Sequence, residues 1–210
     1  IDEFVKQFCA AVDALKMGLP WESGVKITPL LEPSKPAYLR ELIHDATSKG
    51  AAIVNANGGR FDRSFVSPTV LYPVDASMRI YNEEQFADVI PIVKFSRMEE
   101  CLDYAINSHY GQQASIFTQD AKAVPELLDV LVHQVSRINL NCQCQRSPDN
   151  LPFTGRKDSA VGTLSVYDAL RAMSIRTLTC CKENDEASVE LFTNVMTSRK
   201  STFLRADYLQ

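Results

Sequence analysis

The sequence predicts an α/β fold in which a mostly parallel β-sheet carries helices on both faces. Short apolar runs, typical of buried strands, alternate along the chain with amphipathic helical patterns. The connections between them are short, as in parallel sheets that are covered by helices. The composition agrees with a folded globular domain, since 45% of the 210 residues are hydrophobic and 23% are charged.

The helices are predicted from apolar residues at spacings of three and four along the chain. Gly50 ends the second helix, and Ser96 and Glu99 have the spacing of a capping box at the start of the third. Asp120 is expected to cap the fourth. The predicted helices span 2–17, 35–49, about 97–108, a segment with Leu127, Leu128 and Leu131, and about 165–173.

The strands are predicted from short apolar runs between these helices. Pro68 interrupts the second run, which places that strand at an edge or a bend. Cys142 and Cys144 alternate directly after the fifth run, so we expect them on one side of a strand. The predicted strands span 51–55, 65–74, 89–95, 114–118, 137–141 and 175–181.

The two ends of the chain differ from the rest. The N-terminus, IDEFVKQFCAAVDALKMGLP, has acids at positions 2 and 3 and no basic region, so it is not a signal peptide. It begins inside an amphipathic pattern without Met, which leads us to expect a piece of a longer protein. Residues 183–210 open acidic and are expected to form an appended, mostly helical extension.

The net charge and the pattern of cysteines argue against several kinds of binding partner. The net charge of −4 argues against a general electrostatic grip on nucleic acid or on anionic membranes, and no apolar run approaches 18 residues. The six cysteines form no C-x-x-C pair, and a site at Cys142 and Cys144 would need two further ligands. We therefore expect reduced thiols in a cytoplasmic protein, no metal, no nucleic acid and no membrane partner.

Catalytic motifs that act alone are missing from the sequence. There is no G-x-G-x-x-G, no P-loop, no G-x-S-x-G elbow and no cysteine with a nearby histidine. Three other stretches are informative together: NEEQFADVIPIVKF at 82–95, SHYGQQASIFTQD at 108–120, and INLNCQCQRSPDNLPFTGRKDSAVG at 138–162. Their order, spacing and residue types resemble the aldehyde dehydrogenase superfamily over residues 1 to about 182.

The resemblance implies a division of the chain into three parts. Residues 1–173 correspond to part of the catalytic domain, and residues 174–182 correspond to the strand through which these enzymes oligomerise. Residues 183–210 lie beyond the family pattern. Because the last strand would otherwise leave unpaired edge groups exposed, we expect it to pair within a homo-oligomer or, as the alternative, to be covered by the 183–210 tail.

The loop QRSPDNLPF-x-G-x-KDS is most similar to that of the non-phosphorylating, NADP-dependent glyceraldehyde-3-phosphate dehydrogenases within this superfamily. By that resemblance Arg146 would face the phosphate of a phosphorylated aldehyde, because a guanidinium binds phosphate through two parallel hydrogen bonds. Phe153 would form part of the tunnel wall. Lys157 is expected to fix the loop rather than to touch substrate. The alternative for Arg146 is a solvated loop arginine.

The motif EE-x-F carries the implied cofactor contacts. Glu84 would accept two hydrogen bonds from the nicotinamide ribose, and Phe86 would pack beside the nicotinamide. Glu83 is expected to partner a backbone or basic group, and the alternative for both acids is a solvated turn. Ala87 and Asp88 stand where the family has Gly-Pro, so we expect strain at Ala87 and an added charge near the cofactor.

The activity implied by the resemblance needs residues outside this chain. The family oxidises aldehydes through a thiohemiacetal on a cysteine that lies upstream of the segment matching Ile1, together with an upstream cofactor domain. We therefore expect a part of an NAD(P)-dependent enzyme that oxidises glyceraldehyde 3-phosphate to 3-phosphoglycerate. This segment alone should be inactive and should bind neither NADP nor NAD tightly. The alternative is a non-catalytic assembly or binding module derived from the family.

Overall fold

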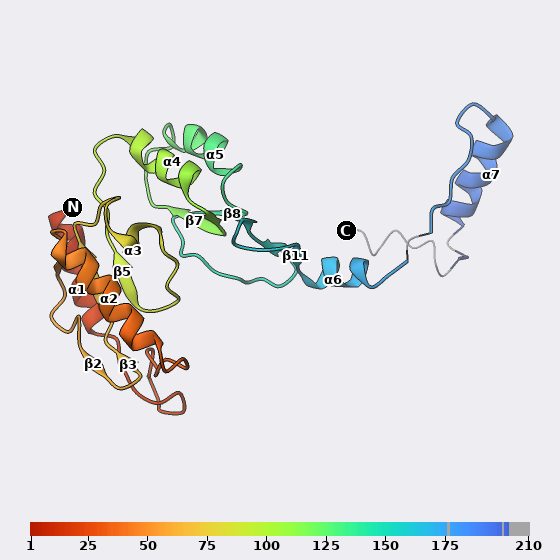
Figure 1. The fold of residues 1–210 in the computed structure, drawn as a ribbon. Helices are drawn as coiled ribbons and strands as arrows, with labels where there is room; N and C mark the ends of the chain where they lie inside the picture. Colours follow the sequence, from red (N-terminus) through yellow and green to blue (C-terminus); the bar gives the residue numbers. More distant parts are fainter. Residues whose placement is uncertain (176, 199, 202–210) are drawn as a thin grey trace. The chain divides into compact units, whose positions relative to one another are not determined.

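The structure is a computed structural model that describes residues 1–175, 177–198 and 200–201. The chain divides into two compact units, which are described separately below. The first unit comprises residues 1–146 and 153–163, and the second comprises 147–152 and 164–210 (Figure 1).

The first unit contains five helices and most of the strands. Its helices are α1 (Asp2–Asp13), α2 (Lys35–Ser48), α3 (Arg79–Asn82), α4 (Met98–Asn107) and α5 (Val124–Leu131). The longer strands are β4 (Thr69–Tyr72), β5 (Val89–Pro91), β7 (Gln113–Ile116) and β8 (Arg137–Leu140). The short ones are β1 (Ala52–Ile53), β2 (Phe61–Asp62), β3 (Phe65–Val66), β6 (Tyr110–Gly111), β9 (Phe153–Thr154), β10 (Arg156–Lys157) and β11 (Thr163–Leu164), which crosses the unit boundary.

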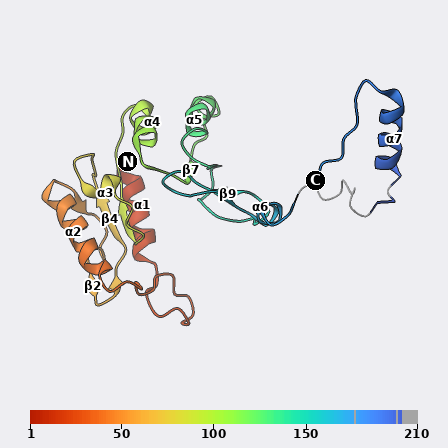
Figure 2. The same cartoon turned by 45° about the vertical axis from the view of Figure 1, so that its right-hand side comes forward.

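The three-stranded sheet β1-β4-β5 lies between two helices. Val70 faces α1, where it packs with Cys9 and Val12, whereas Leu71 packs with the buried face of α2. Because successive side chains of a strand point to opposite faces, one strand supplies both cores. Figure 2 shows α2 and α1 on either side of this sheet. The predicted cover of helices on both faces is found here.

The second sheet has helices on one side among the described residues. Strands β7 and β8 pair in parallel, and α4 and α5 lie on the same side of them (Figures 1 and 2). Leu127, Leu131 and Val135 form the buried centre of this layer. The partly buried residues packed against it are Leu102, Ala105, Ala114, Ile116 and Ile138.

The expectation of one mostly parallel sheet does not describe these strands. The pairs β4–β5 and β7–β8 are parallel, but β1–β4, β2–β3 and β6–β10 are antiparallel. The connections explain the difference. A helix lies between the strands of each parallel pair, whereas only the β2–β3 hairpin separates β1 from β4. A crossover helix permits a parallel return, and a chain that only doubles back gives an antiparallel one.

Two predicted helix caps are wrong in detail. Helix α4 begins after Arg97, and Glu100 rather than Glu99 accepts a hydrogen bond from the Ser96 amide, at 3.4 Å. Helix α5 begins after Ala123 with a proline in its first turn, whose fixed φ suits that position. Asp120 instead accepts from the Lys122 amide at 2.9 Å in the preceding turn.

Cys142 and Cys144 do not lie on a strand. Strand β8 ends at Leu140, and Asn141 takes a left-handed conformation with φ 51°. The Asn141 side chain also exchanges two hydrogen bonds of 2.9 Å with the backbone of Thr118, which closes the end of the sheet. All six cysteines are free thiols, and Cys9 is the buried one.

The second unit contains α6 (Val166–Ala172) and α7 (Glu186–Thr197). Ser165 caps α6 by accepting a hydrogen bond of 3.0 Å from the Asp168 amide. Residues 175 and 177–182 form no strand within this chain, so the predicted strand at 175–181 is absent from its described part. Pairing of 174–182 with a neighbouring subunit stays a prediction. Helix α7 lies where the extension was expected to be helical, and residues 202–210 lie outside the described part.

Among the described helices, none has both the length and the apolar character needed to cross a membrane. The same described residues contain no group of three or more histidine, cysteine or acidic side chains placed to hold a metal ion.

Asp13 joins the end of α1 to the sheet. Its carboxylate accepts hydrogen bonds from the Asn55 side chain at 2.9 Å and from the amides of Ala56 and Asn57 at 2.9 and 3.0 Å. Asn55 is buried and in turn accepts from the Val70 amide at 2.9 Å. Burial alone would raise the pKa of Asp13, but the three hydrogen bonds outweigh it and the pKa is lowered.

We predict that Asp13 makes stability depend on pH. Because its folded-state pKa lies below the unfolded value, the carboxylate stabilises the fold at neutral pH, and this contribution is lost as pH falls through the folded pKa. Between about pH 5 and pH 2, the free energy of unfolding measured with urea should fall more for the wild-type 210-residue chain than for Asp13→Asn. The exposed Asp62→Asn is the control, and equal pH profiles for the wild type and Asp13→Asn would contradict this role.

Candidate functional site

The turn that joins α3 to β5 contains the EE-x-F motif. The Gln85 side chain holds this turn, since it accepts a hydrogen bond from the Ala87 amide at 2.6 Å and donates to the Val89 carbonyl at 2.8 Å. Phe86 takes the left-handed conformation with φ 41°. Ala87 does not, so the strain expected at Ala87 lies one residue earlier, and the side chain of Gln85 stabilises the turn instead.

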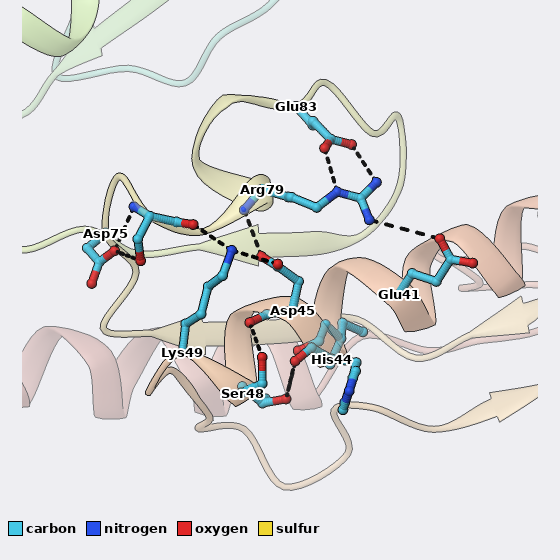
Figure 3. Close-up of polar contacts among 11 residues, drawn as sticks. Glu41, His44, Asp45, Ser48, Lys49, Asp75, Arg79 and Glu83 are labelled. Carbon is cyan, nitrogen blue, oxygen red and sulfur yellow. Dashed lines mark hydrogen bonds and ion pairs between the residues drawn. The ribbon is translucent and has the colours of Figure 1, made fainter.

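Glu83 is paired, as the sequence suggested. Both of its oxygens accept from Arg79, with Nε–Oε1 and Nη2–Oε2 distances of 2.6 and 3.1 Å (Figure 3). The Tyr38 hydroxyl donates to Oε2 at 2.9 Å. The hydrogen bond from Arg79 is the main cause of a lowered Glu83 pKa, so the carboxylate is ionised at neutral pH. The expectation of a basic partner for Glu83 is confirmed.

Glu84 is exposed and lines a cavity of about 770 Å³. The wall is formed largely by α4, α5 and β7, and it also includes Cys144 and Ser159. Glu84 and Phe86 together line a second cavity of about 290 Å³, which Tyr104 and Tyr110 border. The Phe86 ring is 80% exposed. The turn therefore presents a carboxylate and an aromatic face side by side.

Asp88 carries the extra acid of the motif. Burial raises the pKa of this carboxyl above its usual range. Its backbone carbonyl accepts from the Thr69 amide at 2.8 Å, which attaches the end of the turn to β4. Asp88 lines a cavity of about 430 Å³ with Lys26 and Lys35, and that cavity does not include Glu84. Phe86 also lines this cavity, so the acid at this position shares a cavity with the aromatic residue of the motif but not with Glu84.

The loop after β8 places Arg146 against an aromatic ring. The Arg146 guanidinium lies 5.4 Å from the centre of the Phe153 ring, and the arginine itself is exposed. A cation over an aromatic face is held in orientation while its N–H groups remain available. The structure therefore brings Arg146 and Phe153 together. Neither residue lines the 770 or the 290 Å³ cavity, which contain Glu84.

Lys157 fixes the loop to α4. Its Nζ donates to the carbonyls of Ala105, Ile106 and Ser108 at 2.7, 2.9 and 2.8 Å, at the C-terminal end of that helix. A cation there also faces the negative end of the helix dipole. The Gly111 amide donates to Ser159 Oγ at 2.8 Å, which adds a second attachment. These contacts agree with the expected structural role of Lys157.

A polar network lies at the start of the same loop. Asn139 is 3% exposed, and its Nδ2 lies 3.2 Å from the Ala114 carbonyl and 3.7 Å from Cys144 Sγ. Ser115 Oγ lies 3.3 Å from the same sulfur. The Gln113 side chain accepts from the Gln145 amide at 3.1 Å. This network orients the chain that leads into Arg146.

Sequence reasoning missed three residues that shape the site. The spacing of Arg79 and Glu83 by four positions is a helix ion-pair signal that predicts their contact. Gln85 has no pattern that identifies its role. Tyr38 lies 45 positions from Glu83 along the chain, so only the packing of α2 reveals it.

The chain thus combines an α/β fold with a turn that carries an exposed carboxylate and an exposed aromatic residue, and with a loop that carries an exposed arginine. The model of the aldehyde dehydrogenase family matches residues 1–178, so this chain belongs to that family.

Relatives of known activity agree with this assignment. The chain is 33% identical over 173 residues to an NADP-dependent glyceraldehyde-3-phosphate dehydrogenase of Streptococcus equinus, which covers 82% of this chain and 35% of the relative. A lactaldehyde dehydrogenase of Methanococcus aeolicus is also 33% identical, over 82% of this chain and 36% of its own length. The chain thus spans about a third of the length of the curated relatives it matches.

Solved structures share the fold. The NADP-dependent glyceraldehyde-3-phosphate dehydrogenase of Bacillus halodurans C-125, complexed with NADP, superposes with a TM-score of 0.78 at 32% identity, covering 85% of this chain and 36% of that one. The glyceraldehyde-3-phosphate dehydrogenase of Methanocaldococcus jannaschii, also complexed with NADP, gives 0.75 at 28% identity over 83% and 37%.

We predict that Lys157→Met loosens the loop from α4. Loss of the charged hydrogen bonds to three carbonyls should lower the free energy of unfolding by about 1 kcal/mol and speed amide exchange at Gly111 and Asp158. Urea unfolding and hydrogen exchange on the 210-residue chain measure both. The exposed Lys122→Met should change stability by less than about 0.5 kcal/mol. Equal exchange in both variants would rule out the anchoring role.

Proposed function

We propose that this chain is the C-terminal portion of an NAD(P)-dependent aldehyde dehydrogenase that oxidises glyceraldehyde 3-phosphate to 3-phosphoglycerate. Membership of the family and the similarity to NADP-dependent glyceraldehyde-3-phosphate dehydrogenases support the proposal. In it, Glu84 and Phe86 bind the cofactor, and Arg146 and Phe153 bind the substrate.

The turn at Glu84 fits a nicotinamide nucleotide. A carboxylate offers two acceptor oxygens to the two adjacent hydroxyls of a ribose. Glu84 is exposed on the cavity, while Glu83 beside it is held by Arg79 and Tyr38. The exposed ring of Phe86 supplies a flat apolar surface for a nicotinamide. When bound, the cofactor supplies the oxidising capacity for the aldehyde.

The Arg146–Phe153 pair is the observation that carries the choice of a phosphorylated substrate. Its guanidinium is oriented by the ring, and its planar donors match a phosphate. The Asn139 network and Lys157 hold the two ends of the loop. A loop that is attached at both ends loses less conformational entropy on binding a ligand than an unattached one, which supports this placement of the phosphate.

The chain alone is proposed to be inactive. Thiohemiacetal formation needs a thiolate near neutral pH, and burial raises the pKa of both Cys9 and Cys101. The nucleophile and most of the cofactor site are proposed to lie in the part of the relatives that precedes the matched segment. The full-length enzyme is proposed to be cytoplasmic and homo-oligomeric.

The substrate proposal predicts a selective effect of Arg146→Met in the full-length protein that contains this sequence. The KM for glyceraldehyde 3-phosphate should rise about tenfold or more, while the KM for unphosphorylated glyceraldehyde stays within about twofold. NADP reduction followed at steady state measures both constants, with the exposed Arg63→Met as the matched control. Equal KM values in wild type and Arg146→Met would exclude the phosphate contact. A wild-type protein that reduces no NADP would exclude the enzyme.

The cofactor proposal predicts that Glu84→Gln affects the KM for NADP and not the KM for the aldehyde. The amide keeps the size of the side chain but offers one oxygen to the two ribose hydroxyls, so the KM for NADP should rise about tenfold. The KM for the aldehyde should stay within about twofold. The same steady-state assay separates the two constants, and an unchanged KM for NADP would remove Glu84 from the cofactor site.

A further inference from the structure

Of the two neighbouring carboxylates in the turn, one is paired within the protein and the other is exposed. Both oxygens of Glu83 accept hydrogen bonds from Arg79 (Figure 3), and the Tyr38 hydroxyl also donates to Oε2. Glu84 is instead exposed on the cavity. Burial is the main cause of a raised Tyr38 pKa, so the hydroxyl stays protonated and can donate to Glu83. Because Arg79 and Tyr38 bind Glu83, Glu84 is the acid that remains available to a ligand.

Helix α2 fixes Arg79 independently of Glu83. The Arg79 amide donates to Asp45 Oδ2 at 2.8 Å, and Lys49 Nζ bridges Asp45 Oδ1 at 2.7 Å and the Ser77 carbonyl at 2.6 Å (Figure 3). The start of α3 is thus attached to the last turn of α2 and to its C-cap residue. A bidentate arginine held in this way has little freedom, so the position of Glu83 follows from it.

We propose that Arg79 and Tyr38 are positioning residues for Glu84. By occupying both oxygens of Glu83 they fix the residue that opens the turn, and they leave Glu84 as the carboxylate that faces the cofactor. The proposal rests on the proposed function in which Glu84 binds the nicotinamide ribose.

The division of roles follows from geometry and charge. Arg79 and Glu83 are four positions apart across one helical turn, which favours their pairing. Tyr38 adds a third donor on Oε2, so Glu83 competes better than Glu84 for the cation. Without Glu83 as its partner, the Arg79 guanidinium could pair with Glu84 instead. It would compete with ribose hydroxyls for the same oxygens.

The test measures cofactor and aldehyde KM values in the full-length protein. Arg79→Leu should raise the KM for NADP roughly tenfold, as Glu84→Gln does, and Tyr38→Phe should raise it roughly threefold. The KM for the aldehyde should stay within about twofold in both. Arg79→Lys should give an intermediate value, because a lysine keeps the charge but loses the two-pronged geometry.

The matched control is Glu41→Gln. Glu41 also faces Arg79, at 3.9 Å from Nη1, but it does not touch Glu83, so its substitution should leave the KM for NADP unchanged. Tyr38→Phe removes a single hydroxyl and keeps the packing of the ring, so it tests the proposal even where Arg79→Leu fails to fold.

A second measurement separates this proposal from the proposed function. Amide hydrogen exchange at residues 84–87 of the 210-residue chain should be faster in Arg79→Leu and Tyr38→Phe than in wild type or Glu41→Gln. Exchange unchanged in both variants overturns the positioning role, whether or not the full-length protein reduces NADP. Faster exchange with a KM for NADP within twofold of wild type also overturns it. A wild type without activity rejects the proposed function, and with it the assignment of Glu84 as the positioned ligand.

Discussion

The burial of β4 from both sides is the constraint on which the first sheet depends. Val70 and Leu71 are both 0% exposed, one packed under α1 and the other under α2. A strand covered on both faces can take partners only along its edges, and it pairs with β1 on one side and β5 on the other. The crossover from β4 to β5 contains α3 and the EE-x-F turn. The crossover that contains the turn therefore starts from β4 and returns to pair with it, and β4 is the most deeply buried strand among the described residues.

Each of the two proposed site motifs contains a pair of like charges, and in each pair one residue is bound within the protein while the other is exposed. Glu83 is bound by Arg79 and Tyr38, and Glu84 is exposed. Lys157 is bound by two carbonyls of α4 and by that of Ser108 directly after it, and Arg146 is exposed over an aromatic ring. Lys157 attaches its loop to the C-terminal end of α4, where unpaired carbonyls and the helix dipole favour a cation, whereas Glu83 is held by the side chains of Arg79 and Tyr38.

The sequence predicted the elements better than their assembly. Helical spacing identified α1, α2, α4 and α5 because it depends on local periodicity. It did not predict the antiparallel β1–β4 pair, since strand direction depends on the connection rather than on the strand itself. A basic partner for Glu83 was predictable, but the contribution of Tyr38 was not, because it depends on how α2 packs. The strain expected at Ala87 was misplaced because Gln85 compensates through its side chain.

Opposite charges at the two site loops have a consequence for ligand sorting under the proposed function. A phosphate carries negative charge and a ribose diol does not, so an anionic Glu84 disfavours phosphate while it accepts hydroxyl groups. A cationic Arg146 favours phosphate, and the contact with the Phe153 ring restricts the rotation of its guanidinium. Under that proposal, the aldehyde's phosphate would bind at the Arg146 loop and the cofactor's ribose at the Glu84 turn. Because Arg79 of α3 is paired with Glu83, its charge does not offset that difference. The aldehyde and the cofactor both carry phosphate. Under the proposed function, the site distinguishes them because Arg79 and Glu83 are paired with each other, which leaves Glu84 and Arg146 as the exposed charges.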